Sequence, residues 1–142
     1  MKDSASNLEW DYRLPRSRIL RGRENIQRLF LKGRKLKERH VDLRYLIFHD
    51  QPGICQMGFI TGKRLGKAHE RNLVKRRMKE AYRLNQHLIL DAVKFGEIGF
   101  HGILVAKNSR TSFQILNEEC IRLLTLVRDQ LQHPHLQQGG AS

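Results

Sequence analysis

The chain has 142 residues, of which 39% are hydrophobic, and it carries a net charge of +13. This length and apolar content are enough for one domain with a buried core, which excludes a disordered basic tail. No apolar run approaches the roughly 20 residues of a membrane span, and residues 1–12 are polar and lack the apolar stretch of a signal peptide. We therefore expect a cytoplasmic protein with no membrane partner.

The positive charge is concentrated in two blocks of the sequence. Residues 13–39 contain eleven Lys and Arg against two Glu, residues 62–83 contain nine against two Glu, and residues 84–142 contain five charges of each sign. Clustered charge repels itself in a folded protein, and a polyanion relieves this repulsion because each neutralised phosphate releases counterions. The pattern favours nucleic acid over an anionic membrane as the partner.

The first predicted elements are a helix and two strands. Apolar side chains recur every three or four positions over residues 21–32, and a glycine follows, which predicts a helix. Alternating apolar residues predict a strand over 41–49, and the turn sequence at 50–53 leads into a second strand over 54–61. Because the turn is short, we expect the two strands to pair as an antiparallel hairpin.

Residues 68–83 contain no Gly or Pro and predict a helix with two distinct faces. The polar face carries Arg71, Asn72, Lys75, Arg76, Lys79 and Arg83. The apolar face carries Leu73, Val74, Met78, Ala81 and Leu84, and Arg77 lies at its edge. One face is therefore suited to the core and the other to a negatively charged partner.

The remaining chain predicts one more strand and one more helix. A short apolar run over 102–106 predicts a buried strand, and Thr111 begins a helix in which Gln114 completes a capping box. The buried stripe of this helix is expected to contain Phe113, Leu116, Cys120, Leu123, Leu124, Val127 and Leu131. The order α-β-β-α-β-α predicts an α+β fold, a small two-layer α/β sandwich formed by one domain over residues 13–132, with a loose tail over 133–142.

The sequence offers no evident catalytic group. Cys55 and Cys120 lack metal-site spacing and are expected to be reduced thiols packed as small apolar side chains. No serine, cysteine or paired-carboxylate constellation stands out, and the close pair His133 and His135 lies in the expected tail. A self-sufficient nuclease is therefore disfavoured.

The most informative segment runs from Lys63 to Arg83 and reads KRLGKAHERNLVKRRMKEAYR. Glycine permits a tight turn from strand into helix, and arginines can form paired hydrogen bonds with phosphate oxygens. The order resembles the signature of bacterial ribonuclease P proteins, a K-K-x-G-x-A turn followed by R-N-R-x-K-R-x-x-R-E. The matching residues are Lys63, Gly66, Ala68, Arg71, Asn72, Lys75, Arg76 and Glu80, with Lys79 in place of an arginine.

The resemblance is strong over residues 18–83 and extends to the order of the later elements. Residues 25–33 resemble the D-F-x-x-V-F-x-x-G helix of the family. Leu73 stands where an arginine is usual and Ile26 where an aromatic residue is usual, and the connection over 84–100 is longer than usual.

The resemblance implies a left-handed β-α-β crossover that carries the basic helix. It also implies a catalytic RNA partner that uses Mg²⁺ to remove the 5′ leader of precursor tRNA, while the protein supplies no catalytic side chain and requires no protein partner. The residues expected to contact this RNA are Lys63, Arg64, Lys67, Arg71, Asn72, Lys75, Arg76, Lys79 and Arg83. A non-enzymatic ribosomal or assembly protein is the alternative.

The resemblance further implies a cleft between the first helix and the sheet that holds the single-stranded leader. By position, the residues expected to line or surround it are Arg16, Arg18, Phe30, Tyr45, Phe59 and Lys63. Aromatic stacking within a cationic groove is a common way to bind single strands. Core packing of Phe30 and Tyr45 is the open alternative.

Overall fold

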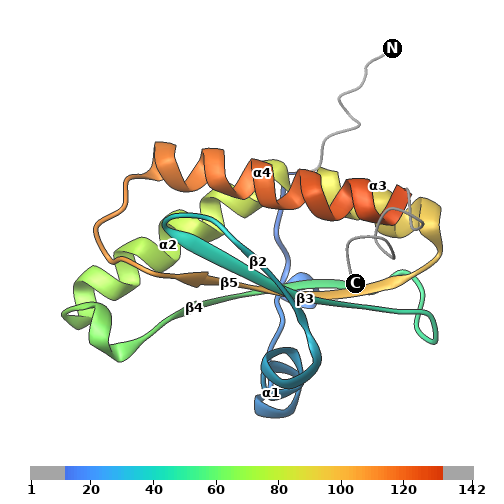
Figure 1. The fold of residues 1–142 in the computed structure, drawn as a ribbon, viewed down its shortest axis with the longest axis horizontal. Coiled ribbons are helices and arrows are strands. Elements are labelled where there is room, and N and C mark those ends of the chain that lie inside the picture. The colour runs from blue at the N-terminus through green and yellow to red at the C-terminus, as the bar shows by residue number, and fades with distance from the viewer. Residues whose placement is uncertain (1–11, 133–142) are drawn as a thin grey trace.

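The computed structural model describes residues 12–132 (Figure 1). The tail expected over residues 133–142, with its histidine pair, and residues 1–11 of the expected polar segment lie outside the described residues. The elements in chain order are η2 (Arg16–Arg18), α1 (Arg23–Lys32), β2 (Arg34–Lys37), β3 (Val41–Phe48), β4 (Cys55–Thr61), η3 (Lys63–Leu65), α2 (Ala68–Asn85), α3 (His87–Gly96), β5 (Gly99–Ala106) and α4 (Phe113–Gln132).

The described strands form one sheet in the order β2-β3-β5-β4. β5 is antiparallel to β3 along its whole length and parallel to β4. The predicted hairpin between β3 and β4 is therefore wrong, because β5 lies between them. Seven of the eight β5 residues are buried, and a strand covered on both faces takes a central place in its sheet.

The parallel pair β4 and β5 is joined by a β-α-β crossover through α2 and α3. The sequence predicted α2 but gave no assignment to the residues of α3. Ile89, Ala92 and Val93 form the buried face of α3, and Glu97 follows it in the left-handed conformation, with φ of 52°. The left-handed sense of the crossover stays a prediction.

Helices cover both faces of the sheet. α2, α3 and α4 lie on one face and α1 on the other (Figure 1). The larger core packs between the sheet and the three helices, while Leu20, Leu29 and Ile103 form a smaller core under α1. The predicted mixed α+β fold is confirmed, and α1 adds a partial third layer.

Three local features complete the comparison with the sequence expectations. β2 was not predicted, because its sequence Arg-Lys-Leu-Lys is almost entirely charged. The first residue of α4 follows Ser112, whose Oγ accepts a hydrogen bond from the Ile115 N–H at 3.3 Å, so the capping box predicted from Thr111 is wrong. The predicted buried thiols are confirmed: burial raises the pKa of both Cys55 and Cys120 to about 12.

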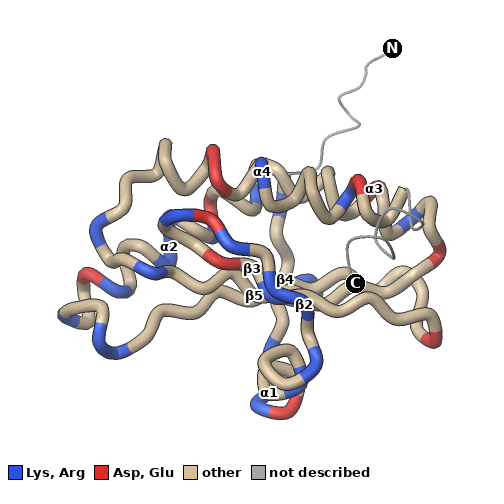
Figure 2. The backbone as a smooth tube through the Cα atoms, viewed as in Figure 1, with Lys and Arg blue, Asp and Glu red and all other residues tan. Residues whose placement is uncertain are grey.

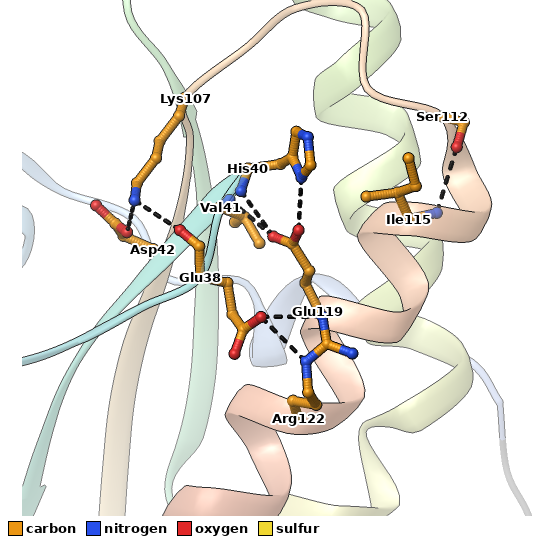
Figure 3. A network of polar contacts seen from close by, with 9 residues as sticks. All are labelled: Glu38, His40, Val41, Asp42, Lys107, Ser112, Ile115, Glu119 and Arg122. Carbon is orange, nitrogen blue, oxygen red and sulfur yellow. Dashed lines mark hydrogen bonds and ion pairs between the residues drawn. The ribbon is translucent and has the colours of Figure 1, made fainter.

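A buried carboxylate fastens the sheet to α4 (Figure 3). Glu119, on α4, is 2% exposed. Its Oε1 accepts the backbone N–H groups of His40 and Val41 at 2.8 and 3.1 Å, and its Oε2 lies 2.6 Å from His40 Nδ1. These contacts satisfy backbone donors at the beginning of β3, since a buried donor without a partner is costly.

We expect Glu119→Ala to lower the free energy of unfolding by about 2–4 kcal/mol, because it leaves two backbone donors without their acceptor. Chemical denaturation measures this change. The neighbouring Glu118 is exposed, and Glu118→Ala is the matched control, expected to change stability by less than about 0.5 kcal/mol. Equal effects of the two substitutions would contradict a structural role for Glu119.

Candidate nucleic-acid interface

α2 separates apolar from cationic side chains, as its sequence predicts. Val74, Met78, Ala81 and Tyr82 are buried against the sheet and α4. Leu73, which was expected on the apolar face, is 37% exposed. It therefore lies at the exposed border of the apolar face and not in the core.

The turn before α2 depends on Gly66, which has φ of +143°. A Cβ at this position would lie 2.5 Å from Glu70 Oε1, so the carboxylate packs directly on the glycine. Glu70 accepts the Lys67 N–H at 2.9 Å, and this hydrogen bond, with a smaller contribution from Arg110, lowers the pKa of the carboxyl group. The turn therefore places Lys63, Arg64 and Lys67 just before the helix.

Two of the predicted RNA-contacting arginines also bind within the protein. Arg71 Nε donates to the Gly66 carbonyl at 3.1 Å and thereby stabilises the turn. Arg83 donates from Nε to Glu80 and from Nη1 to the Tyr12 carbonyl, both at 3.0 Å. Arg83 is therefore largely committed to intramolecular contacts.

The other predicted cations of this segment are exposed and free. Among the described residues, no side-chain partner is found for Lys63, Arg64, Lys67, Lys75, Arg76 or Lys79. Figure 2 shows blue segments along α2 and the loop before it. Unpaired charge on one surface favours binding of a polyanion. We call these six residues the α2 cation surface.

On the opposite face of the sheet, α1 presents an aromatic ring paired with a cation. Phe30 is 41% exposed, and the Arg44 guanidinium carbon lies 4.7 Å from the centre of its ring. The strand register places Lys35 opposite Arg44, on the same face. Sequence reasoning did not select Arg44, although the alternation along β3 places it on the face opposite Tyr45.

The structure does not bring the predicted cleft residues together. Tyr45 and Phe59 are 1% and 7% exposed and belong to the core under α2 and α4, on the face opposite α1. Tyr45 OH also donates to Gln130 on α4. The prediction that these two rings line a cleft with Phe30 is therefore wrong. Both occupy odd-numbered positions of β3 and β4, and the side chains at these positions point toward the larger core.

The two predicted cleft arginines lie in η2, which packs against β4. Arg16 is exposed, and its place in a cleft stays a prediction. Arg18 Nη1 donates to Gln86 Oε1 at 2.8 Å, at the junction of α2 and α3. Arg18 therefore stabilises the crossover and does not accompany Phe30.

Two features of residues 12–132 bear on other functions. In this part of the chain no group of three or more His, Cys, Asp or Glu could hold a metal ion. Within the same residues no helix is long and apolar enough to cross a membrane.

The family model Ribonuclease P matches residues 14–128. The ribonuclease P protein component of Chlorobaculum tepidum is 36% identical over 99 residues, 66% of this chain and 64% of the relative, so the chain spans less than two thirds of that protein. The component from Pelotomaculum thermopropionicum is 27% identical over 75% of this chain and 88% of its own length.

Solved structures show the same fold. The Staphylococcus aureus RNase P protein superposes with a TM-score of 0.64 at 17% identity, covering 79% of this chain and 96% of its own. The RNase P protein from Thermotoga maritima gives a TM-score of 0.61 at 23% identity, covering 75% of this chain and 94% of its own.

The different positions of the two phenylalanines predict different effects of truncation. Phe59→Ala should lower the free energy of unfolding by about 3–5 kcal/mol, because it empties a filled core. Phe30→Ala removes an exposed ring and a cation–π contact and should cost about 1 kcal/mol or less. Thermal melts compare the two variants directly, and a large loss of stability in Phe30→Ala would place that ring in the core after all.

Proposed function

Since this chain belongs to the ribonuclease P family, we propose that it is the protein subunit of that ribonucleoprotein. In this proposal it binds the catalytic RNA and the 5′ leader of precursor tRNA, and it promotes the endonucleolytic cut that forms the mature 5′ end. The family match over residues 14–128 favours this function over a ribosomal or assembly protein. Precursor tRNA processing implies a cytoplasmic location, and no membrane or additional protein partner is required.

The observation that carries the proposal is the α2 cation surface. Six unpaired cations extend from η3 along the exposed face of α2, and a rigid core holds the opposite face of the helix. Phosphates of a folded RNA can neutralise these charges and release counterions. Asn72 is exposed beside them and can donate to or accept from sugar or base edges, while Arg71 and Arg83 position the turn and the end of the helix.

The single-stranded leader is assigned to the face of the sheet that carries α1. There Phe30 offers a ring for base stacking and Arg44 supplies neighbouring positive charge, while Lys35 lies beside Arg44 and 3.7 Å from the Asp42 carboxylate. A stacking residue within a cationic surface suits a single strand of any sequence. This assignment keeps Phe30 and replaces Tyr45 and Phe59 with residues that face solvent.

Hydrolysis is assigned to the RNA, whose bound Mg²⁺ would activate the attacking water. Of the two carboxylates near the α2 cation surface, Glu70 caps the helix and Glu80 pairs with Arg83. Both are therefore occupied with structural contacts. The role of the protein is to screen phosphate repulsion and to hold the leader, which matters most where Mg²⁺ is scarce.

Reconstitution tests this function. Mixed with a bacterial ribonuclease P RNA at low Mg²⁺, the protein should raise the rate of leader release from precursor tRNA, whereas the protein alone should release none. Gel analysis of labelled precursor measures both rates. Cleavage by the protein alone that survives nuclease treatment of the preparation would contradict the assignment of catalysis to RNA.

If the α2 cation surface binds RNA phosphates, the affinity for RNA should depend on the salt concentration, and removing one cation should reduce this dependence. Arg76→Ala should weaken binding of the RNA subunit by about 1–3 kcal/mol and lower the slope of log K against log salt by about 1, because one phosphate contact is lost. Lys75→Ala should act similarly, and Arg71→Ala should add a loss of helix-turn stability.

Lys94→Ala is the control for these variants, because it removes an exposed charge from α3, away from the α2 cation surface (Figure 1). It should leave both affinity and slope nearly unchanged. If Arg76→Ala and Lys94→Ala gave the same slope as the unmodified protein, the α2 cation surface would be a solvated face and not an RNA contact.

A further inference from the structure

α1 divides its face of the sheet into two flanks. Phe30 and Arg28 are two residues apart and therefore point about 200° apart around the helix. The flank of Phe30 was assigned above to the leader. The flank of Arg28 borders a hollow of about 460 Å³, whose lining includes Asn25, Arg28, Phe48, Asp50, Gln56 and His101. This volume lies in the range of small-molecule sites.

Two rings form the aromatic part of this hollow. Phe48 and His101 meet edge to face, with ring centres 4.9 Å apart. Phe48 packs closely on the backbone at Gly99, where a Cβ would come within 2.0 Å of the phenyl ring. The glycine therefore allows the phenylalanine to lie against the sheet, beside the hollow.

Arg28 determines which ring nitrogen of His101 carries the proton. Arg28 Nη2 lies 3.3 Å from His101 Nδ1, and burial together with the Arg28 charge lowers the pKa of the imidazole. An arginine can only donate, so Nδ1 accepts and the neutral ring carries its proton on Nε2. Among the described residues Nε2 has no hydrogen-bond partner, so it is a free donor.

The other polar groups of the hollow are also only partly used. Arg28 Nη2 donates to Asn25 Oδ1 at 3.0 Å, which leaves Nε and Nη1 without a partner within residues 12–132. Gln56 Nε2 donates to the Ser17 carbonyl at 3.0 Å, which leaves its Oε1 as an acceptor. The hollow therefore combines aromatic carbon with free donors and free acceptors.

We propose that this hollow binds one unstacked nucleobase of single-stranded RNA, next to the Phe48 and His101 rings. The site rests on the proposed function only in that RNA supplies the base. It lies on the flank of α1 opposite Phe30, so it is a separate contact from the stacking surface assigned to the leader.

The chemistry of the lining favours a base over other ligands. A base presents both donors and acceptors along its edge, which match Arg28 and His101 Nε2 on one side and Gln56 Oε1 on the other. A free phosphate would be attracted by Arg28 but repelled by the carboxylate of Asp50, which also lines the hollow. Aromatic carbon contributes through stacking, which a phosphate cannot use.

Nucleotide titration of the full-length protein tests the site without any RNA subunit. We would add each of the four nucleoside 5′-monophosphates, and separately inorganic phosphate, to isotope-labelled protein at constant ionic strength. At least one nucleotide should shift the side-chain resonances of Asn25, Gln56 and His101. If inorganic phosphate produced the same shifts as strongly, or no nucleotide produced any, the proposal would be wrong.

A matched pair of variants locates the binding. Arg28 and Arg23 are both exposed on α1, and only Arg28 lines the hollow. Arg28→Ala should raise the dissociation constant for the tightest-binding nucleotide about tenfold or more, since hydrogen bonds to a charged group are worth that factor. Arg23→Ala should change it less than about twofold, and equal effects would overturn the proposal.

The holoenzyme identifies the source of the base. If the leader supplies it, Arg28→Ala should weaken binding of a precursor with a long leader and spare one whose leader is a single nucleotide. If the RNA subunit supplies it, the variant should weaken assembly with that RNA and affect both precursors equally. No loss in any of these assays would overturn the proposal, whereas stimulation of cleavage by the unmodified protein is measured independently.

Discussion

The position of β5 is the constraint on which the rest of the structure depends. Among the strands of residues 12–132, β5 is the last in the sequence, yet it lies between β3 and β4 and is buried almost throughout. Its register with β3 decides which side chains face the larger core, and its parallel pairing with β4 requires a crossover through helices. That crossover carries the α2 cation surface and fixes its place relative to the sheet.

Residues that pack in the core and residues available for binding lie on opposite faces of the same elements: on alternate positions of a strand, and on opposite sides of a helix. Alternate residues of β3 belong either to the core, as Tyr45 does, or to the surface under α1, as Arg44 does. Likewise, α2 buries Val74 and Met78 while it exposes Lys75 and Arg76. Charge can therefore accumulate on two surfaces without entering the core, where an unpaired cation would be severely penalised.

Sequence reasoning succeeded where local chemistry decides the structure. The period of α2 and the glycine before it predicted the helix and its cations. The core face was predicted in part, since Leu73 is exposed and the buried Tyr82 was not expected there. It failed where the structure depends on segments that are distant in the sequence. The short turn between β3 and β4 predicted a hairpin, and no local pattern indicates that β5 lies between these two strands. Tyr45 occupies an odd-numbered position of β3, as the core residues Val41 and Leu43 do, so the alternation agrees with core packing, the alternative that the sequence left open for this ring.

The late position of β5 has a consequence for how the protein is made. Neither β3 nor β4 has its main partner until residues 99–106 have left the ribosome, by which time both basic blocks have already been synthesised. Pairings between distant segments also form slowly. The nascent chain therefore carries both basic blocks before the sheet can close, and the RNA of the ribosome itself is a polyanion that attracts this charge.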